Sequence, residues 1–321
     1  MKIIDLFCGA GGFSYGFKPH IDDTHLAIDI DSSSLETYTL NFPDSIVLQA
    51  DIHNLHSLQI SEAFNGTPDI IIASPPCEEF SKANPDSCKS AAARVYGEGS
   101  GKLLLDAIRI ISDFSPEVFI IENVAALLHA GGKEIIKKEF ERVGLDDIHF
   151  NMIRAHQHGN PSRRLRVFIS NIKLKLPRKV PPTVMEAIGD LPDLGLNQIL
   201  SPEVYIPNHV DYPISEERMK AISRTRWGQG ARRFRVSKMR SLPNWVRLFP
   251  NQLATSINGL SRYIHPYENR ILTVREHARL MSYPDSFVFT GFSDSQYNQV
   301  GESVPPIVSQ LIAKEVCDNI V

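Results

Sequence analysis

The sequence predicts an α/β protein with a parallel, doubly wound sheet and a smaller irregular or β-rich module. Apolar runs of strand length alternate with helical patterns over residues 1 to about 170. A glycine-rich turn, Gly9-Ala10-Gly11-Gly12, follows the first run and precedes a helical pattern. After about Leu176 prolines cluster and the alternation stops. Strands that alternate with helices are typical of parallel sheets covered on both faces, so the first part carries the sheet.

Six apolar runs are the expected strands. Each is short and bounded by turn residues or a carboxylate, as is typical of buried strands in α/β proteins. In chain order they cover residues 3–7, 26–29, 46–48, 70–72, 118–121 and 165–169. Helical patterns fill the gaps, most clearly over 102–114 and 133–143.

The expected division of the chain has boundaries at 176 and 268. Residues 1–176 form a first domain, 177–268 a separate module, and 269–321 a segment that completes the first domain. Regularity returns at Thr273, a predicted helix cap, and Glu276 three residues later completes a capping box. A last helix is expected from about Pro306 to Asp318.

The composition is that of a globular protein, with 321 residues, 42% hydrophobic and 22% charged. No apolar segment approaches the ~20 residues that span a membrane, and the N-terminus lacks a signal-peptide pattern. A cytoplasmic protein without a membrane partner is therefore expected. Four cysteines without CxxC spacing argue against a zinc site or a disulfide framework: Cys8, Cys77, Cys88 and Cys317.

Charge is distributed unevenly along the chain. The net charge is −3, so the whole molecule gives no nucleic-acid signal. Residues 218–247, however, hold ten Lys or Arg and no Asp or Glu. Such a basic segment is the footprint expected for phosphate contact, and a solvated surface is the alternative. Its cations are Arg218, Lys220, Arg224, Arg226, Arg232, Arg233, Arg235, Lys238, Arg240 and Arg247.

Polar groups at three strand ends favour an adenosine-type site. The glycine-rich turn permits close backbone approach to a ligand, and Asp29, ending the next strand, can bind ribose hydroxyls. Asp51 follows the third strand and can accept from an adenine amino group. The alternative is that both aspartates only cap helices or turns.

Cys77 follows the fourth strand in the stretch IIIASPPC. Ligands of open α/β sheets bind outside the carboxyl ends of the strands, where a nucleophile would lie. Two prolines stiffen this turn. The alternative, a small buried hydrophobe, is the usual environment of a free cysteine, and position alone does not decide between them.

Several motifs together resemble those of the cytosine-C5 DNA methyltransferases. DLFCGAGG, PPC, ENV, RRLRVF, LTVREHARLMSYPD and VGESVPP occur in that family's order, over nearly the whole chain outside 177–268. The resemblance implies a Rossmann-like methyltransferase fold that uses S-adenosylmethionine. Residues 1–176 and 269–321 would form the catalytic domain, and 177–268 the target-recognition domain.

The resemblance also implies roles for individual residues. Cys77 matches the nucleophile, Glu122 the acid that engages cytosine N3, and Arg164 and Arg166 the arginines of the QxRxR motif. Cofactor contacts are expected from Phe7, Gly9, Gly11, Asp29, Ile30, Asp51, Ile52, Pro76, Glu302 and Ser303. DNA contacts are expected from Arg226, Arg232, Arg233 and Arg235 of the basic segment. The aromatic residues among these arginines are expected to pack the module, with contact to bases as the alternative: Trp227, Phe234 and Trp245.

The chemistry explains why these residue types are needed. Cytosine C5 is a poor nucleophile, and a thiolate that adds at C6 makes it enamine-like. An acid at N3 and an arginine near O2 stabilise the charge that enters the ring. A stacked base cannot reach such a site, so it must flip out of the duplex. Residues 80–101, directly after the nucleophile, are then expected to form a closing loop.

Three positions depart from the family pattern. Glu78 stands where the family has Gln after the PPC cysteine. Ser162 stands in place of the Gln of QxRxR, and Glu302 stands in place of the Asn of GNSVP. Glu302 would lie near the cofactor, where its carboxylate can pair with the methionine ammonium. These changes concern fine detail and leave the Cys, Glu and Arg set complete.

The leading hypothesis is a sequence-specific DNA cytosine-C5 methyltransferase, with the modification half of a restriction-modification system as one setting. Double-stranded DNA is the expected binding partner. A cognate restriction endonuclease would be a functional partner that does not bind the protein, which is expected to be a monomer. In a prokaryote it would associate with the nucleoid. The alternatives are a tRNA cytosine-C5 methyltransferase and a catalytically silent DNA-binding homologue.

Overall fold

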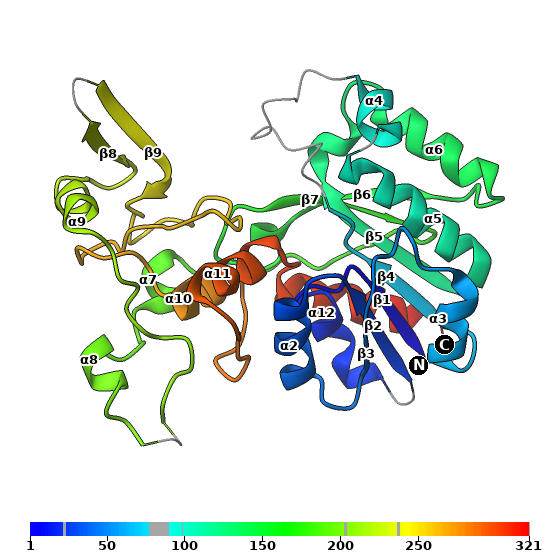
Figure 1. Ribbon diagram of the computed structural model, residues 1–321, viewed down its shortest axis with the longest axis horizontal. Helices are drawn as coiled ribbons and strands as arrows, with labels where there is room; N and C mark the ends of the chain where they lie inside the picture. Colours follow the sequence, from blue (N-terminus) through cyan, green and yellow to red (C-terminus); the bar gives the residue numbers. More distant parts are fainter. Residues whose placement is uncertain (22–23, 77–89, 98, 202–203, 236–237, 321) are drawn as a thin grey trace. The chain divides into compact units, whose positions relative to one another are not determined.

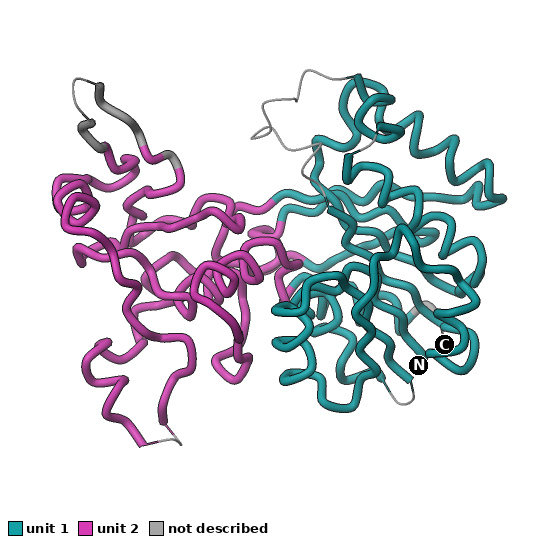
Figure 2. Tube along the Cα trace, in the orientation of Figure 1, with its two compact units in different colours: residues 1–154, 165–177, 308–321 teal, residues 155–164, 178–307 magenta. Residues whose placement is uncertain are grey.

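The computed structural model describes residues 1–21, 24–76, 90–97, 99–201, 204–235 and 238–320. It divides into two compact units, coloured separately in Figure 2. Unit 1 comprises residues 1–154, 165–177 and 308–321, and unit 2 comprises 155–164 and 178–307. Within the described residues, no helix has the length and apolar character needed to cross a membrane.

Unit 1 is built on a seven-stranded sheet (Figure 1). Its strands lie in the order β3-β2-β1-β4-β5-β7-β6. Neighbours from β3 to β5 are parallel, whereas β7 is antiparallel to both β5 and β6. The strands are β1 (Ile3–Leu6), β2 (His25–Asp29), β3 (Ile46–Gln49), β4 (Ile70–Ala73), β5 (Val118–Val124), β6 (His149–Arg154) and β7 (Leu165–Ser170).

Alternate residues of these strands bury the two faces of the sheet. On one face Ile4, Ile71 and Phe119 join a core with side chains from three helices, α3 (Ser57–Phe64), α5 (Leu103–Phe114) and α6 (Gly132–Arg142). On the other face the ring of Phe168 meets that of Phe13, with centroids 5.9 Å apart. Burial of both faces explains why the strands are almost continuously apolar.

The last helix, α12 (Pro306–Ile320), packs on the first, α1 (Ser14–Phe17). The Gly16 backbone N–H donates to Ser309 Oγ at 3.0 Å. A Cβ on Gly16 would lie 2.1 Å from the Ser309 carbonyl carbon, so only glycine allows this approach. The end of the chain therefore completes unit 1.

The remaining elements of unit 1 are short, apart from α2. They are η1 (Lys18–His20), α2 (Ser32–Asn41), α4 (Ala91–Tyr96), η3 (Ser100–Lys102) and η4 (Ala125–Leu128). Helix α4 and η3 lie in the region expected to form a closing loop, whereas residues 80–89 of that loop are outside the described residues.

Unit 2 has little repetitive structure. Its strands β8 (Gly230–Arg235) and β9 (Lys238–Val246) form an antiparallel pair. Its helical elements are η5 (Ala155–Gln157), α7 (Val184–Ile188), α8 (Leu194–Asn197), α9 (Glu216–Ser223), α10 (Val274–Leu280) and α11 (Ser293–Glu302). The predicted capping box starts α10: Thr273 Oγ1 accepts from the Glu276 N–H at 3.1 Å.

The predicted fold class and the six expected strands are confirmed, with two differences. Strand β6 was not predicted, and β7 runs antiparallel in a sheet expected to be parallel throughout. Residues 155–164, which join β6 to β7, contain only the short η5 and supply no helical crossover. A parallel connection requires such a crossover, so the chain returns antiparallel.

The compact units also differ from the expected boundaries. Unit 2 continues from 178 to 307, and only the final helix rejoins unit 1. Compactness does not assign function, so the division into catalytic and target-recognition domains stays a prediction.

Candidate active site

The strand order changes direction between β1 and β4, and ligands of open α/β sheets bind at the carboxyl end of such a switch point. Phe7 and Gly9 follow β1, and residues 74–76 follow β4 at this edge. Asp29 ends the neighbouring β2, so the sheet gathers these groups at one place in unit 1.

Asp29 connects the end of β2 to the glycine-rich turn. Its Oδ2 accepts from the Gly9 backbone N–H at 2.8 Å, and its Oδ1 accepts from that of Asp31 at 2.9 Å. Burial raises the pKa of Asp29, and these two backbone hydrogen bonds oppose that shift. Each carboxylate oxygen can still accept a second hydrogen bond, which is what two ribose hydroxyls require.

The two glycines of this turn have different surroundings. A Cβ on Gly9 would meet no atom within 4 Å, so the turn is open to a ligand there. A Cβ on Gly11 would lie 2.4 Å from the Phe42 ring and 3.0 Å from Tyr38, both on or next to α2. The structure therefore explains Gly11 by helix packing, although a cofactor contact was expected.

Two apolar side chains flank this edge. Phe7 has a positive φ of 57°, which is uncommon outside glycine, and packs partly against the core. Ile30 follows Asp29 and is 64% exposed. An exposed isoleucine beside a ribose-type carboxylate fits the apolar face of a purine. Phe7, Gly9, Asp29 and Ile30 thus suit the adenosine part of S-adenosylmethionine.

The expected adenine edge at residues 51 and 52 fits less directly. Asp51 Oδ1 accepts from the His53 N–H at 3.0 Å, and its Oδ2 accepts from Asn54 Nδ2 at 2.7 Å, so the carboxylate closes a turn. Ile52 is 2% exposed and belongs to the core, which leaves only its backbone for a ligand. The turn borders a pocket of about 730 Å³ lined by His53, Asn54 and residues of α3 and α5.

The expected acid lies on β5 beside an arginine of β7. Arg166 Nε is 2.9 Å from Glu122 Oε1, and both side chains are largely buried. Within the described residues no donor is aligned for a hydrogen bond to this buried oxygen. Ser74 Oγ, also buried, has no hydrogen-bond partner there either. Ala73, the last residue of β4, pairs with Ile121 of β5, so Ser74 and Glu122 each come directly after this pair, and both keep bonding capacity for a ligand.

Asn123 fixes the turn that leads to the expected nucleophile. This buried side chain donates from Nδ2 to the Pro75 carbonyl at 3.2 Å. Pro76 is exposed, and Cys77 and Glu78 lie outside the described residues. Sequence reasoning assigned no role to Asn123, although its place in the ENV motif, beside the acid, was a signal.

Arg164, the other arginine of this segment, has different surroundings from Arg166. In unit 2 its Nη1 donates to the carbonyls of Ile257 at 2.8 Å and Gly301 at 2.9 Å. Its guanidinium is buried and holds the chain at the end of α11. These contacts favour a positioning role, and its expected catalytic role stays a prediction.

Glu302 and Ser303 follow in the same segment. The Glu302 Oε1 atom lies where a Cβ on Gly259 would be 2.7 Å away, and Ser303 Oγ donates to the Val300 carbonyl at 2.9 Å. Their expected cofactor contacts stay predictions. Within the described residues, no group of three or more His, Cys, Asp or Glu is arranged to hold a metal ion.

The basic segment separates into exposed and buried cations. Arg226 and Arg232 are exposed, as phosphate contact requires, whereas the side chains of Arg233 and Arg235 lie outside the description. Arg247 is buried and bonds to backbone carbonyls, so it is a structural residue. Trp227, expected to pack, is 46% exposed.

Comparison with known proteins identifies the family. The model of the C-5 cytosine-specific DNA methylase family matches residues 1–318. The chain belongs to this family. It is 42% identical to the putative type II methyltransferase M.MJ0563P of Methanocaldococcus jannaschii, over 98% of this chain and 99% of that protein. It is 32% identical to the type II methyltransferase M1.HphI of Haemophilus parahaemolyticus, over 98% and 86%.

Solved structures agree with this membership. A crystal structure of a putative DNA modification methyltransferase encoded within a prophage (E. coli) has a TM-score of 0.76 and 25% identity, covering 100% of this chain and 99% of that one. The Dnmt2 methyltransferase of S. pombe, at 18% identity and a TM-score of 0.65 over 100% and 99%, shares the fold of this DNA methylase family member.

Proposed function

We propose that this DNA cytosine-C5 methyltransferase acts on a flipped cytosine in double-stranded DNA through a covalent adduct with Cys77. The observation that carries the proposal is the buried Glu122 carboxylate. Its Oε1 lies beside Arg166 and has no aligned donor among the described residues. Glu122 is one residue beyond the last pair of β4 with β5, and the chain that leaves β4 leads to Cys77. When protonated, a carboxyl group at this position can donate to a ring nitrogen.

In the proposed reaction the Cys77 thiolate forms a C–S bond to C6, and the electron pair of the C5–C6 double bond moves into the ring. The proton on Glu122 goes to N3. The positive charge of Arg166 stabilises the carboxylate that remains and the charge that enters the ring. C5 then acquires the methyl group, and a base removes the C5 proton. The C5–H electron pair re-forms the C5–C6 double bond and expels Cys77 as thiolate, and N3 returns its proton to Glu122.

The methyl donor implied by the family is S-adenosylmethionine, which supplies the methyl group from its sulfonium. Gly9, Asp29 and Ile30 would hold its adenosine part, since they offer open space, two hydrogen-bond acceptors and an exposed apolar side chain. Phe7 would contact the same part from the end of β1.

The hairpin of unit 2 supports a polyanionic partner. Its register pairs Arg233 with Arg240 and Arg235 with Lys238. Residues 218–247, which include both strands, hold ten Lys or Arg and no Asp or Glu, as contact with a phosphate backbone requires. We therefore assign duplex contacts to Arg226, which precedes the hairpin, and to Arg232, Arg233 and Arg235 of β8, all in the expected target-recognition domain. The proposed target is a short specific sequence. The relatives named type II methyltransferases support a restriction-modification setting. We further propose that the protein acts as a monomer.

Transfer of a labelled methyl group from S-adenosylmethionine to mixed-sequence duplex DNA tests the function. Cys77→Ser should abolish transfer, and Glu122→Gln should lower it roughly 10²- to 10⁴-fold. A duplex with 5-fluorocytosine should trap a covalent complex, because fluorine blocks the final loss from C5. Label on tRNA and none on duplex DNA would favour the tRNA enzyme, and no label with intact DNA binding would favour the silent homologue.

Neutralising the hairpin tests the DNA-binding surface. Replacing Arg232, Arg233 and Arg235 by Gln should flatten the dependence of DNA affinity on salt by roughly one unit of slope per lost phosphate contact. Replacing Lys173, Lys175 and Arg178, which lie outside the basic segment, is the control. An unchanged slope in the hairpin variant would indicate a solvated face.

A further inference from the structure

A pocket in unit 2 is lined by none of the residues assigned to catalysis or to the cofactor, although one lining residue, Arg226, is an expected DNA contact. Its volume is about 530 Å³, and its lining includes Arg226, Trp227, Arg247, Phe249, Tyr267 and Asn269. Three aromatic rings, one buried guanidinium and one exposed guanidinium therefore meet at a single surface hollow.

The aromatic rings of the pocket are exposed and adjacent. Trp227 is 46% and Tyr267 63% exposed, and Phe249 is also exposed. The Trp227 ring centroid lies 6.1 Å from that of Tyr267 and 6.4 Å from that of Phe249. Aromatic side chains normally bury their faces, so a group of three in contact with solvent indicates a binding surface for a flat apolar group.

The floor of the pocket is built around Arg247. This buried guanidinium donates to the carbonyls of Thr225 at 2.7 Å and His265 at 2.8 Å. It also donates to those of Ile222 and Glu268, and to Asn269 Oδ1 at 2.8 Å. Arg247 thereby holds together the chain segments that carry the three rings.

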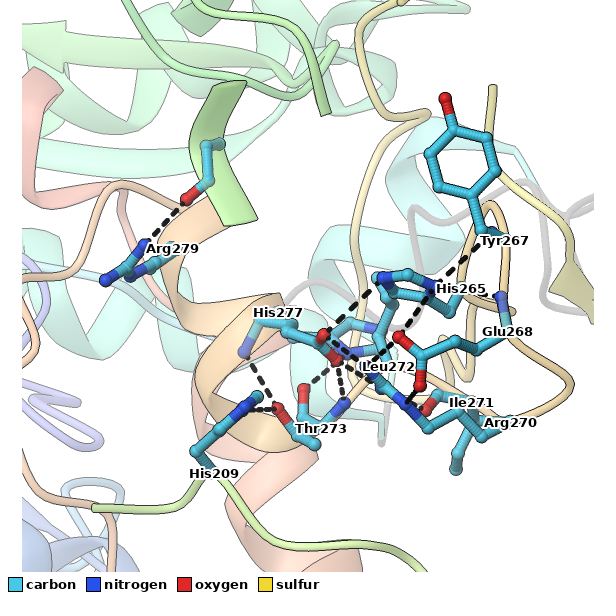
Figure 3. Close-up of polar contacts among 12 residues, drawn as sticks. His209, His265, Tyr267, Glu268, Arg270, Ile271, Leu272, Thr273, His277 and Arg279 are labelled. Atoms are coloured by element: carbon cyan, nitrogen blue, oxygen red, sulfur yellow. Dashed lines mark hydrogen bonds and ion pairs between the residues drawn. The ribbon is translucent and has the colours of Figure 1, made fainter. Parts of the chain in front are cut away.

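The rings themselves are fixed by further contacts. Trp227 Nε1 donates to the Pro266 carbonyl at 2.8 Å. Gly228 has a φ of +74°, and a Cβ there would lie 2.6 Å from the Phe249 ring, so glycine is needed for this packing. His265 Nδ1 accepts from the Tyr267 N–H at 3.3 Å, and Figure 3 shows the Tyr267 ring directed away from the polar cluster around His265. The pocket is therefore preorganised.

The charges at the pocket favour an anionic ligand. Arg226 lines it and is exposed, and Arg224 nearby in the sequence is exposed as well. The acid closest along the chain to Tyr267, Glu268, is held by Arg270 at 2.8 Å. Among the described residues Asn269 Nδ2 has no hydrogen-bond partner, which leaves a donor at the pocket for a base carbonyl or ring nitrogen.

We propose that this pocket stacks an unpaired nucleobase of the DNA substrate on Trp227, Phe249 and Tyr267, with Arg226 on the adjoining phosphate. A flat ring, a donor for its edge and a cation for its phosphate are the features of one nucleotide. The proposal rests on the proposed function, because it takes DNA as the ligand, and adds a second base-binding site to the expected flipped-cytosine site.

Tryptophan fluorescence provides a direct test, since Trp227 and Trp245 are the only two tryptophans of the chain. In a Trp245→Phe protein the signal comes from Trp227 alone. We expect a short oligothymidylate to quench it, and an abasic oligomer with the same number of phosphates to quench it far less. Equal quenching by the two, or none, would overturn the proposal. Quenching by a proline-rich peptide and none by DNA would assign the pocket to a protein partner and would also overturn the proposal.

Affinity separates stacking from charge. Tyr267→Ala should weaken oligothymidylate binding roughly 5- to 150-fold without changing the salt slope. Arg226→Gln should lower that slope by about one unit while saturating quenching persists. Phe292→Ala, which removes an aromatic residue that is 89% exposed and does not line the pocket, is the control. Wild-type affinity of Tyr267→Ala, or the same loss in Phe292→Ala, would contradict stacking.

These measurements need no methyl donor, so they separate the two proposals. A protein that stacks DNA but transfers no methyl group would contradict the function alone. A protein that methylates DNA without quenching of Trp227 would contradict only the stacking site.

Discussion

The two units position their functional groups by different means. In unit 1 the strand register places Glu122 beyond the Ala73–Ile121 pair, and backbone donors hold Asp29. In unit 2 the aromatic residues of the proposed stacking site lie on irregular chain, and buried arginines bond to the carbonyls of such chain. Arg164, Arg247 and Arg275 each join segments far apart in the sequence through such bonds.

The difference follows from the needs of the peptide backbone. A β-ladder satisfies its own N–H and C=O groups, so side chains at strand ends remain available for ligands. Irregular chain leaves buried carbonyls to be satisfied, and a guanidinium offers five donors in a fixed plane. A count of basic residues therefore overstates the DNA contacts of unit 2, because some arginines stabilise the unit itself.

Replacing Arg247 should have the largest effect on stability. Arg247→Met leaves several buried carbonyls without donors, and we expect unit 2 to lose about 3–5 kcal/mol of unfolding free energy. Urea titration followed by tryptophan fluorescence measures this, since both tryptophans lie in unit 2. Exposed Arg226→Met, the matched control, should change it by no more than about 0.5 kcal/mol. Equal effects of the two variants would contradict the distinction between structural and surface arginines.

The paired glycines of unit 1 test whether its ligand edge is separate from its packing. Gly11→Ala should destabilise the unit by roughly 1–3 kcal/mol, because its Cβ would overlap the Phe42 ring at a φ of +92°. Gly9→Ala meets open space and should cost about 1 kcal/mol through its φ of +51° alone.

Thermal unfolding followed by circular dichroism gives the stability of each glycine variant, and equilibrium dialysis gives its affinity for S-adenosylmethionine. The affinity should fall more in Gly9→Ala than in Gly11→Ala, provided that both remain folded. The reverse order would indicate that Gly11, and not Gly9, faces the cofactor.

The effect expected from Asp5, which is buried on β1, appears only as a dependence of stability on pH. Its Oδ2 accepts from Ser14 Oγ at 2.6 Å, and burial raises the pKa of Asp5 to about 8. Between its ordinary value and 8, the folded protein keeps a proton that the unfolded chain has lost, so stability falls as pH rises. Burial lowers the pKa of His25 to about 4. Between pH 4 and 6.5 the unfolded chain therefore holds a proton that the folded protein lacks, so this histidine makes stability rise with pH, and above about pH 6.5 its contribution no longer changes.

From pH 6.5 to 8 we therefore expect a fall of roughly 1–2 kcal/mol in unfolding free energy, measured by urea titration and circular dichroism. Asp5→Asn should remove this fall, whereas Asp44→Asn, at an exposed position, should retain it. A pH dependence that persists in Asp5→Asn would assign it to another group.

The sequence by itself determined the features that depend on neighbouring residues. The apolar runs predicted six strands, and Thr273 with Glu276 predicted the start of α10, because strand pattern and helix capping are local properties. The order of motifs, also readable along the chain, predicted the family.

Only the tertiary structure decided which charged residues are buried and what they contact. In the folded chain Arg166 pairs with Glu122, and Arg164 and Arg247 donate to backbone carbonyls. Trp227 is exposed, and β7 is antiparallel to β5. These outcomes depend on groups far away in the sequence, whose approach is set by packing of the whole unit and not by the residue pattern at each position.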